Sequence, residues 1–237
     1  MDAKPKLLSV LDVVTGVLMA AATLAVFFYA PTERVMGAVQ KVFYFHVAAG
    51  WVGMLGFLAA LAAGVAYLRT HDAKWDIIGL AGVEIGMAFM LINIITGSIW
   101  ARPIWGAWWT WDPRLTTATI MELAYAAYLM LRQGIEEPDR RARFGAVYAI
   151  VAFISVPMTF LSIRIFRTIH PVVIGNGGDV PGAEGGFSMT PKMTQVFMFS
   201  LITWSVLFVD IFWQRIRLGN LANRVEQLKL KLGGRTA

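Results

Sequence analysis

The sequence predicts an all-α integral membrane protein, a single bundle of six transmembrane helices followed by an amphipathic C-terminal helix. Of its 237 residues, 57% are apolar and 15% are charged, and the mean hydropathy of +0.61 lies above that of soluble domains. Six segments approach the length of about 20 mostly apolar residues that a spanning helix needs. Because the connections between them are short, we expect one membrane domain over residues 1–237.

The six expected helices cover residues 8–29, 43–68, 77–99, 115–131, 144–163 and 193–213. The first follows Lys4 and Lys6 as a signal peptide would, but its apolar run exceeds the roughly 7–15 residues of a signal core, so we expect a retained anchor. Pro157 should kink the fifth helix, since it removes a backbone hydrogen bond. Four glycines of the second helix should permit close helix packing: Gly50, Gly53, Gly56 and Gly64.

The basic residues favour a cytoplasmic location for both termini. With the N-terminus inside, the inner segments hold fourteen of the 21 Lys and Arg residues and the outer segments hold seven. Lys and Arg accumulate on the cytoplasmic side of short loops. The net charge of +6 is then explained by contact with anionic membrane lipid, and no nucleic-acid partner is needed.

The tail, residues 214–237, is predicted to be a cytoplasmic amphipathic helix. Its apolar residues recur at spacings of three and four among Arg and Lys: Leu218, Leu221, Val225, Leu228 and Leu232. Two heptads are too few to assert a coiled coil. The inner leaflet and a partner protein therefore both remain candidates for what covers this face.

The segment 100–114 reads W-A-R-P-I-W-G-A-W-W-T-W-D-P-R and contains five of the nine tryptophans. Indole is large, flat and apolar with one N–H donor, so it suits a boundary between a dry and a wet region. The segment also contains two prolines, a glycine and three charged residues, which a core helix avoids. We therefore interpret it as a shaped surface between the third and fourth helices, on the outer side.

Two of the three histidines are expected near this surface. His46 lies about one turn inside the second helix at the outer boundary, and His170 follows the fifth helix by about six residues. His71 lies in an inner loop and is expected to be solvated. Taken alone, His46 would more often be an interfacial residue bonded to backbone or lipid, although ionisable groups within a membrane are functional candidates. A Gly-rich run at 175–186 follows His170 and does not match a phosphate-binding motif.

Two imidazoles, an aromatic platform and arginines together suit haem. The histidines would be axial ligands of the iron, the indoles would cover the ring, and arginines would pair with the propionates. Because the chain has no cysteine, thioether attachment is excluded, and the expected cofactor is non-covalent haem b. The candidate metal ligands are His46 and His170, and the other candidate haem contacts are Trp100, Trp105, Trp108, Trp109, Trp111, Asp112, Arg102 and Arg114, with Arg164 and Arg167 as further propionate partners.

The motif W-G-A-W-W-T-W-D-P-R, preceded by I-T-G-S-I-W-A-R-P-I, resembles the WWD signature of the haem-handling proteins of cytochrome c biogenesis. Six helices, one histidine at the start of the second helix and one in the third outer loop resemble the cytochrome c maturation protein C family, or haem exporter protein C, over nearly the whole chain. The membrane synthetase and the F component share the signature but are longer.

This resemblance implies a component of the bacterial inner membrane that binds haem on the periplasmic side through His46 and His170. It implies transfer of the haem to a periplasmic haem chaperone, the E component, which captures it on a histidine of its own. The implied further partners are an ABC transporter made of A and B components and a small D subunit. The chain has no ATP-binding motif, so we expect a haem-handling component and not an enzyme.

Three other functions remain open. In a cytochrome b-type oxidoreductase, two bis-histidine haems need four histidines and the chain has three, but a quinone enzyme with a single haem is compatible with that number. A haem permease is the second alternative, with Glu84 and Glu122 lining its path. The third is a scaffold for the ABC transporter, in which the tryptophans serve only as an interfacial belt.

Overall fold

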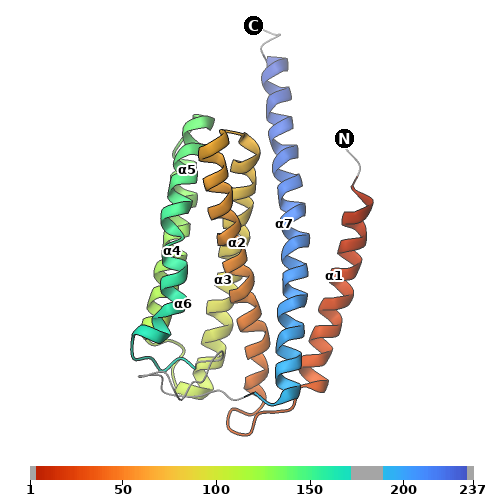
Figure 1. Cartoon of the computed structure of the whole chain (residues 1–237), viewed down its shortest axis with the longest axis vertical. Coiled ribbons are helices and arrows are strands. Elements are labelled where there is room, and N and C mark those ends of the chain that lie inside the picture. Colours follow the sequence, from red (N-terminus) through yellow and green to blue (C-terminus); the bar gives the residue numbers. More distant parts are fainter. Residues whose placement is uncertain (1–3, 172–188, 234–237) are drawn as a thin grey trace.

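The computed structural model describes residues 4–171 and 189–233 of the chain. The Gly-rich run at 175–186 lies outside the described residues. In the described part, helices run up and down along one axis and no β-strand is formed (Figure 1). The elements are α1 (Lys6–Leu24), the π-helical turn η1 (Ala25–Tyr29), the 3-10 turn η2 (Ala38–Lys41), α2 (Val42–Thr70), α3 (Ala73–Trp105), α4 (Pro113–Gln133), α5 (Pro138–Ala152), α6 (Ser155–Ile165) and α7 (Pro191–Gly233).

Five helical segments are long and apolar enough to cross a membrane, which confirms a helical multi-pass protein. They are Lys6–Tyr29, Ala38–Thr70, Ala73–Trp105, Pro138–Ile165 and Pro191–Lys229. The expected sixth helix is α4, whose 21 residues include three threonines, Glu122 and Arg132, so it is more polar than the others. It packs along α5 and α6 in the bundle (Figure 1).

Both described chain ends lie at the same end of the bundle (Figure 1). We call this the inner end, and we call the opposite end, where α3 is followed by α4, the outer end. His71 is exposed in the turn between α2 and α3 at the inner end, as expected, and adopts the left-handed backbone conformation that ends α2, with a φ of 54°. The tryptophan segment and His170 lie at the outer end, far from His71.

The third helix is longer than predicted and takes in part of the tryptophan segment. α3 ends at Trp105, so residues 100–105 are helical and the prediction of an irregular surface there was wrong. Pro103 lies in the last turn of α3, so the backbone hydrogen bond that it cannot donate to Ile99 is lost only near the helix end. Gly106 ends the helix with a φ of 73°, a conformation that strongly favours glycine. The irregular surface is therefore limited to residues 106–112.

The kink predicted at Pro157 is confirmed, since it separates α5 from α6. The break falls at Phe153 and Ile154, and Phe153 is the residue whose carbonyl a proline at position 157 would meet in a regular helix. α5 also begins earlier than expected, at Pro138, because proline fits the first position of a helix. The kinked pair α5–α6 directs its outer end toward the start of α4.

Glycines bring α2 and α3 into close contact, as the sequence predicted. A Cβ atom added to Gly56 would lie 2.6 Å from the carbonyl oxygen of Gly82, and the reverse distance is also 2.6 Å. Any larger residue at either position would force the helices apart. The α2–α3 interface is the most extensive in the bundle, and it fixes the position of His46 relative to α3.

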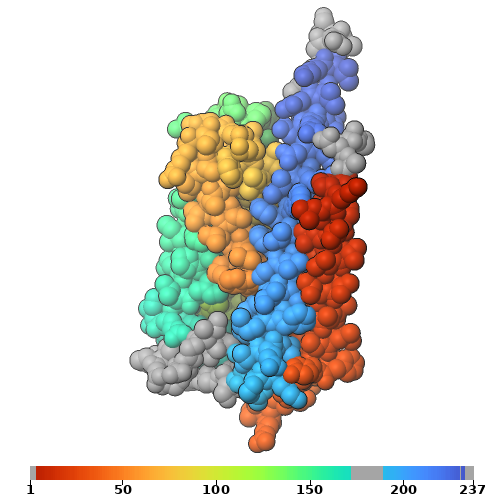
Figure 2. Space-filling model, turned by 45° about the vertical axis from the view of Figure 1, so that its right-hand side comes forward, coloured from red at the N-terminus to blue at the C-terminus, as the bar shows by residue number. Residues whose placement is uncertain are grey.

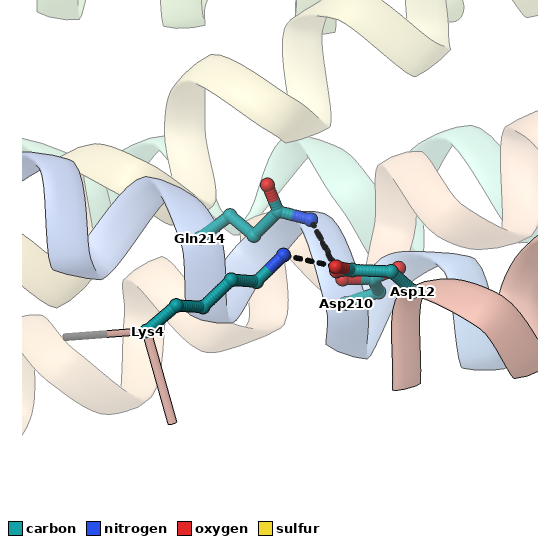
Figure 3. A network of polar contacts seen from close by, with 4 residues as sticks. All are labelled: Lys4, Asp12, Asp210 and Gln214. Atoms are coloured by element: carbon teal, nitrogen blue, oxygen red, sulfur yellow. Dashed lines mark hydrogen bonds and ion pairs between the residues drawn. The ribbon is translucent and has the colours of Figure 1, made fainter. Parts of the chain in front are cut away.

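Polar contacts in the inner half of the bundle join α7 to α3 and to α1. The carboxylate of Glu84 on α3 pairs with the guanidinium of Arg215 on α7. Figure 3 shows Gln214 of α7 donating hydrogen bonds to Asp12 and Asp210, while Lys4 pairs with Asp12. These bonds hold α1 along α7, where Figure 2 shows it lying.

The C-terminal segment is not a separate helix. α7 continues without a break from Pro191 to Gly233, so the predicted boundary near residue 213 was wrong. Lys and Arg allow helix as readily as the apolar residues before them, and nothing between Trp213 and Leu218 interrupts it. As a result, the last turns of α7 project beyond the bundle at the inner end (Figures 1 and 2).

Candidate functional site

An open pocket lies at the outer end of the bundle, between α2, α3, α4 and the segment after α6. Its empty volume, counted out into the open mouth, is about 890 Å³. Both outer histidines, four of the five tryptophans and one arginine line it: His46, His170, Trp100, Trp105, Trp108, Trp109 and Arg114. The pocket is therefore built from segments far apart in the sequence.

His46 lies in the second turn of α2, and its ring is oriented by α3. Its Nδ1 is 2.9 Å from the carbonyl oxygen of Asn93, and the Asn93 side chain donates a 2.7 Å hydrogen bond to the His46 carbonyl. A carbonyl oxygen only accepts hydrogen bonds, so this contact assigns the proton to Nδ1, and it is shorter than the 3.2 Å between Nδ1 and the Asn93 amide nitrogen. The lone pair of the neutral ring is then on Nε2, which is the arrangement of most metal-binding histidines.

His170 follows α6 in the segment that closes the pocket. Its backbone N–H donates to the Thr168 hydroxyl at 3.0 Å, and its Nδ1 lies 3.1 Å from the Pro171 carbonyl oxygen. This again places the proton on Nδ1 and the lone pair on Nε2. Burial, with the positive charge of Arg114 and the proximity of His46 as smaller causes, lowers the pKa of His170 to about 3. The ring is therefore neutral at pH 7.

The two imidazole rings are inclined to each other by 36°, with ring centroids 6.4 Å apart. A metal–imidazole nitrogen bond is about 2 Å long, which puts each ring centroid roughly 3 Å from the metal and two opposed rings roughly 6 Å apart. The observed separation thus suits one ion held between the two rings. Among residues 4–171 and 189–233, no group of three or more His, Asp or Glu side chains forms a metal site. An ion held by these two histidines would take its other ligands from outside this set of side chains, as the iron of haem does from its macrocycle.

Asp112 holds the His170 segment in place. Its carboxylate accepts hydrogen bonds from the Thr168 hydroxyl at 2.7 Å and from the Ile169 backbone N–H at 2.9 Å. It also caps α4 by accepting from the Arg114 backbone N–H at 2.9 Å. Asp112 is buried and does not line the pocket. It therefore positions His170 through its bonds to the two preceding residues.

The two arginines of the tryptophan segment lie in different places. The Arg114 guanidinium lines the pocket, donates to the Thr159 carbonyl oxygen and lies over the Phe160 ring at 4.5 Å. Arg102 is directed away from the pocket and donates to the carbonyl oxygen of Gly106, which closes the turn after α3. Of the two, Arg114 is placed to meet an anionic group inside the pocket.

The tryptophans form two perpendicular pairs. Trp100 and Trp105 meet edge to face with centroids 5.2 Å apart, and both line the pocket. Trp109, which lines the pocket, meets Trp111 at 5.9 Å. Trp111 lies outside the lining and is 76% exposed, and Trp108 at the rim is 60% exposed. The segment thus offers an inner wall and an exposed outer edge.

Comparison with known proteins decides the family. The Heme exporter protein C family model matches residues 1–231. The chain belongs to the Heme exporter protein C family. It is 30% identical to Heme exporter protein C of Bradyrhizobium diazoefficiens over 209 residues, which is 88% of this chain and 77% of that protein. It is also 30% identical to the protein of the same name from Rhodobacter capsulatus, over 86% of this chain and 82% of the relative.

The Escherichia coli K12 protein of that name is 26% identical over 145 residues, 61% of this chain and 59% of the relative. The matched range of the Heme exporter protein C family includes every residue that lines the pocket. The family predicted from the tryptophan segment is therefore confirmed by a match that extends over nearly the whole chain. Asp112 also lies within the matched range.

Sequence reasoning missed the small residues that make room for the His46 ring in this family member. A Cβ atom added to Gly97 would lie 2.9 Å from His46 Cε1, and one added to Gly50 would lie 2.9 Å from the Asn93 amide nitrogen. Asn93, Gly97 and Trp100 are spaced by four and three residues, so they share one helix face. That spacing was a signal that could have linked them.

Alanine at Gly97 is expected to displace the His46 ring and weaken haem retention by about tenfold. The added methyl group would overlap the ring edge, and the ring cannot retreat while Nδ1 is bonded to Asn93. Haem content per protein after purification, read by absorbance, measures the effect. Gly16→Ala is the matched control, because nothing lies within 4 Å of a Cβ there. Equal haem content in both variants would contradict the prediction.

Proposed function

We propose that this protein binds haem b non-covalently in the outer pocket and presents it to a periplasmic haem chaperone during cytochrome c maturation. Membership of the Heme exporter protein C family supports haem handling. The relatives carry haem export in their names. The pocket supports a carrier in particular, because it is open at the outer end and has both apolar walls and a cation.

The observation that carries the proposal is the close pair of neutral imidazoles. His46 and His170 come from segments more than 120 residues apart, yet their rings meet across one pocket with centroids at 6.4 Å. Each ring has its Nδ1 within hydrogen-bond distance of a backbone carbonyl, which assigns the lone pair to Nε2. The Asn93 amide nitrogen, 3.5 Å from the His46 Nε2, would have to yield to an axial bond there. An interfacial histidine with only structural bonds would need no such partner.

Different residues of the pocket would contact different parts of the haem. When bound, haem supplies a flat apolar ring, an iron that takes axial nitrogen ligands, and two propionates. Trp100, Trp105 and Trp109 offer apolar surface to the ring. Arg114, fixed by Thr159 and Phe160, is the pairing partner for a propionate. These contacts keep the cargo in place without a covalent bond, in agreement with the absence of cysteine.

The two histidines are held differently, which bears on how haem would be released. His170 lies on a segment held by side-chain bonds to Asp112, and His46 lies on a helix that α3 packs tightly. We infer that His170 is the ligand that leaves, and that an incoming histidine of the chaperone takes its place. The exposed Trp108 and Trp111 at the rim are the surface that the chaperone meets.

The proposal places the pocket on the periplasmic side of the bacterial inner membrane. The basic residues of the inner end support this orientation by the positive-inside rule. The same proposal includes assembly with the ABC transporter A and B components and the small D subunit. The described chain contributes the haem site, and ATP hydrolysis belongs to the transporter.

Haem transfer between purified proteins tests the function. The haem-loaded protein in lipid nanodiscs is mixed with the soluble domain of a periplasmic haem chaperone, and the two are separated by size. Haem should leave the nanodisc fraction and appear with the chaperone, and a chaperone without its haem-binding histidine should receive none. Haem that stays in the nanodiscs while the protein reduces a quinone would instead support an oxidoreductase.

A further inference from the structure

The last turns of α7, about four in number, present an apolar stripe that nothing in the described structure covers. Its members are 40–62% exposed and follow the three-four spacing of a coiled-coil seam: Leu218, Leu221, Val225, Leu228 and Leu232. Elsewhere in the bundle, exposed apolar residues are accounted for by lipid. The position of this stripe shows whether lipid can also explain it.

The stripe extends past the end of the bundle. A Cβ atom at Gly219 would lie 2.6 Å from the Ile77 side chain, so Gly219 is level with the start of α3. α3 begins at Ala73, about one turn from Ile77, beside the exposed polar turn that contains His71. Residues of α7 after about 223 therefore lie beyond that polar end (Figures 1 and 2). A helix that continues straight from a membrane span stands away from the leaflet, so the leaflet does not cover this stripe.

The charges beside the stripe indicate which partner fits. With Leu218 at position a, the flanking e and g positions hold Arg217, Ala222, Arg224, Lys229 and Lys231. In a pair of these helices, parallel or antiparallel, basic residues would face basic residues across the seam, which is unfavourable. A second copy of this chain is therefore a poor partner. A helix with acidic flanks is complementary.

The helix itself also needs a partner. Gly219, Asn220 and Asn223 are weak helix formers, and an isolated helix of fewer than about 12–15 residues is marginal in water. The turns beyond the bundle are about that short. Packing along the apolar stripe would supply the stabilisation that their composition does not.

We propose that residues 218–232 of α7 are a docking site for an amphipathic helix of a cytoplasmic or membrane-associated partner protein, one whose apolar seam is flanked by Glu and Asp. The two helices pack as a short hetero coiled coil. Leu221, Val225 and Leu228 form the buried centre, and Lys229 and Lys231 pair with the acidic flanks. The site lies at the opposite end of the bundle from the haem pocket, so its occupancy and haem binding can be measured separately.

A designed heptad peptide tests the site on the full-length protein in nanodiscs. The probe has leucine at its a and d positions and glutamate at e and g, and a second peptide has lysine at e and g. Because the chain has no cysteine, Ala222→Cys gives one labelling position beside the seam for a fluorescence titration. The acidic peptide should bind at least about tenfold more tightly than the basic one, and added salt should weaken it.

Matched aspartate variants locate the binding surface. Leu228→Asp should weaken binding of the acidic peptide by about tenfold or more. Gln227→Asp introduces the same charge away from the seam and should change the affinity for the peptide little. Equal binding of both peptides, or no binding of either, would overturn the proposal. So would a dimer in detergent that Leu228→Asp dissociates, which indicates a second copy. A blue shift of the label in anionic nanodiscs without peptide would instead assign the stripe to lipid.

Discussion

Haem is expected to be almost absent from protein purified with His46→Ala or His170→Ala, a fall of about 100-fold in affinity. Second-shell partners of a metal ligand alone are worth roughly 10–100-fold, and a first-shell ligand should be worth at least as much. Both rings line the same pocket with centroids 6.4 Å apart, and the third histidine of the chain, His71, lies at the opposite end of the bundle. Haem content and the absorbance spectrum of the purified protein measure the loss.

A glycine variant separates the loss of a ligand from the loss of the fold. His170→Gly leaves a space at the mouth of the pocket into which free imidazole can enter. Adding imidazole should restore the low-spin spectrum typical of two axial imidazoles, because His46 is still present. The double variant His46→Ala with His170→Gly should not recover to the same extent.

His71 provides the matched control for both variants. It is exposed at the inner end, and its backbone is left-handed with a φ of 54°. His71→Asn is the suitable change, since asparagine tolerates that conformation better than alanine does. Its spectrum should equal that of the unchanged protein. Unaltered spectra for both His46→Ala and His170→Ala would refute axial ligation by these residues.

The sequence alone predicted the parts of the molecule that depend on composition and period. Apolar runs of spanning length marked the helices, and helix parity brought His46 and His170 to one end. Pro157 also breaks the helix at the residues four and three positions before it, where its missing hydrogen bond and its ring act. Each of these features rests on local properties of the chain, which is why they could be read without a structure.

The errors in prediction have a different physical origin. Residues 100–105 were expected to be irregular, but they continue α3, because Pro103 removes one backbone bond near the helix end and Gly106, with its left-handed backbone, is what ends the helix. The support that Asp112 gives to the His170 segment was not predicted, because its partners Thr168 and Ile169 are more than 50 residues away, while its contact with haem stays a prediction. Contacts between residues so far apart in the sequence depend on how the helices pack, and no local sequence pattern predicts them.

Asp112→Ala is expected to weaken haem binding by about 10–100-fold without touching the haem, because it releases the segment that carries His170. The change removes the acceptor for the Thr168 hydroxyl and the Ile169 N–H, and a buried donor left unpaired costs about 1–3 kcal/mol. It also removes the cap of α4, worth about 1 kcal/mol. Haem retention and thermal stability should therefore both fall.

The Thr168 hydroxyl gives an independent measure of the same support. Thr168→Val keeps the shape of the side chain but removes the donor to Asp112 and the acceptor for the His170 N–H. It should weaken haem binding in the same direction as Asp112→Ala. Thr168→Ser keeps the hydroxyl and should behave nearly as the unchanged protein. The effects of Asp112→Ala and Thr168→Val should not add, since both break one network.

Added imidazole distinguishes a positioning role for Asp112 from a general loss of stability. If Asp112 acts by placing His170, then free imidazole should restore the low-spin spectrum of Asp112→Ala, as it should for His170→Gly. An unfolded or collapsed pocket would not respond. If Asp112→Ala instead keeps both axial ligands in its spectrum and loses only transfer to the chaperone, then Asp112 acts at the chaperone-binding edge beside Trp111, and the ligand that leaves during transfer is held by some other contact.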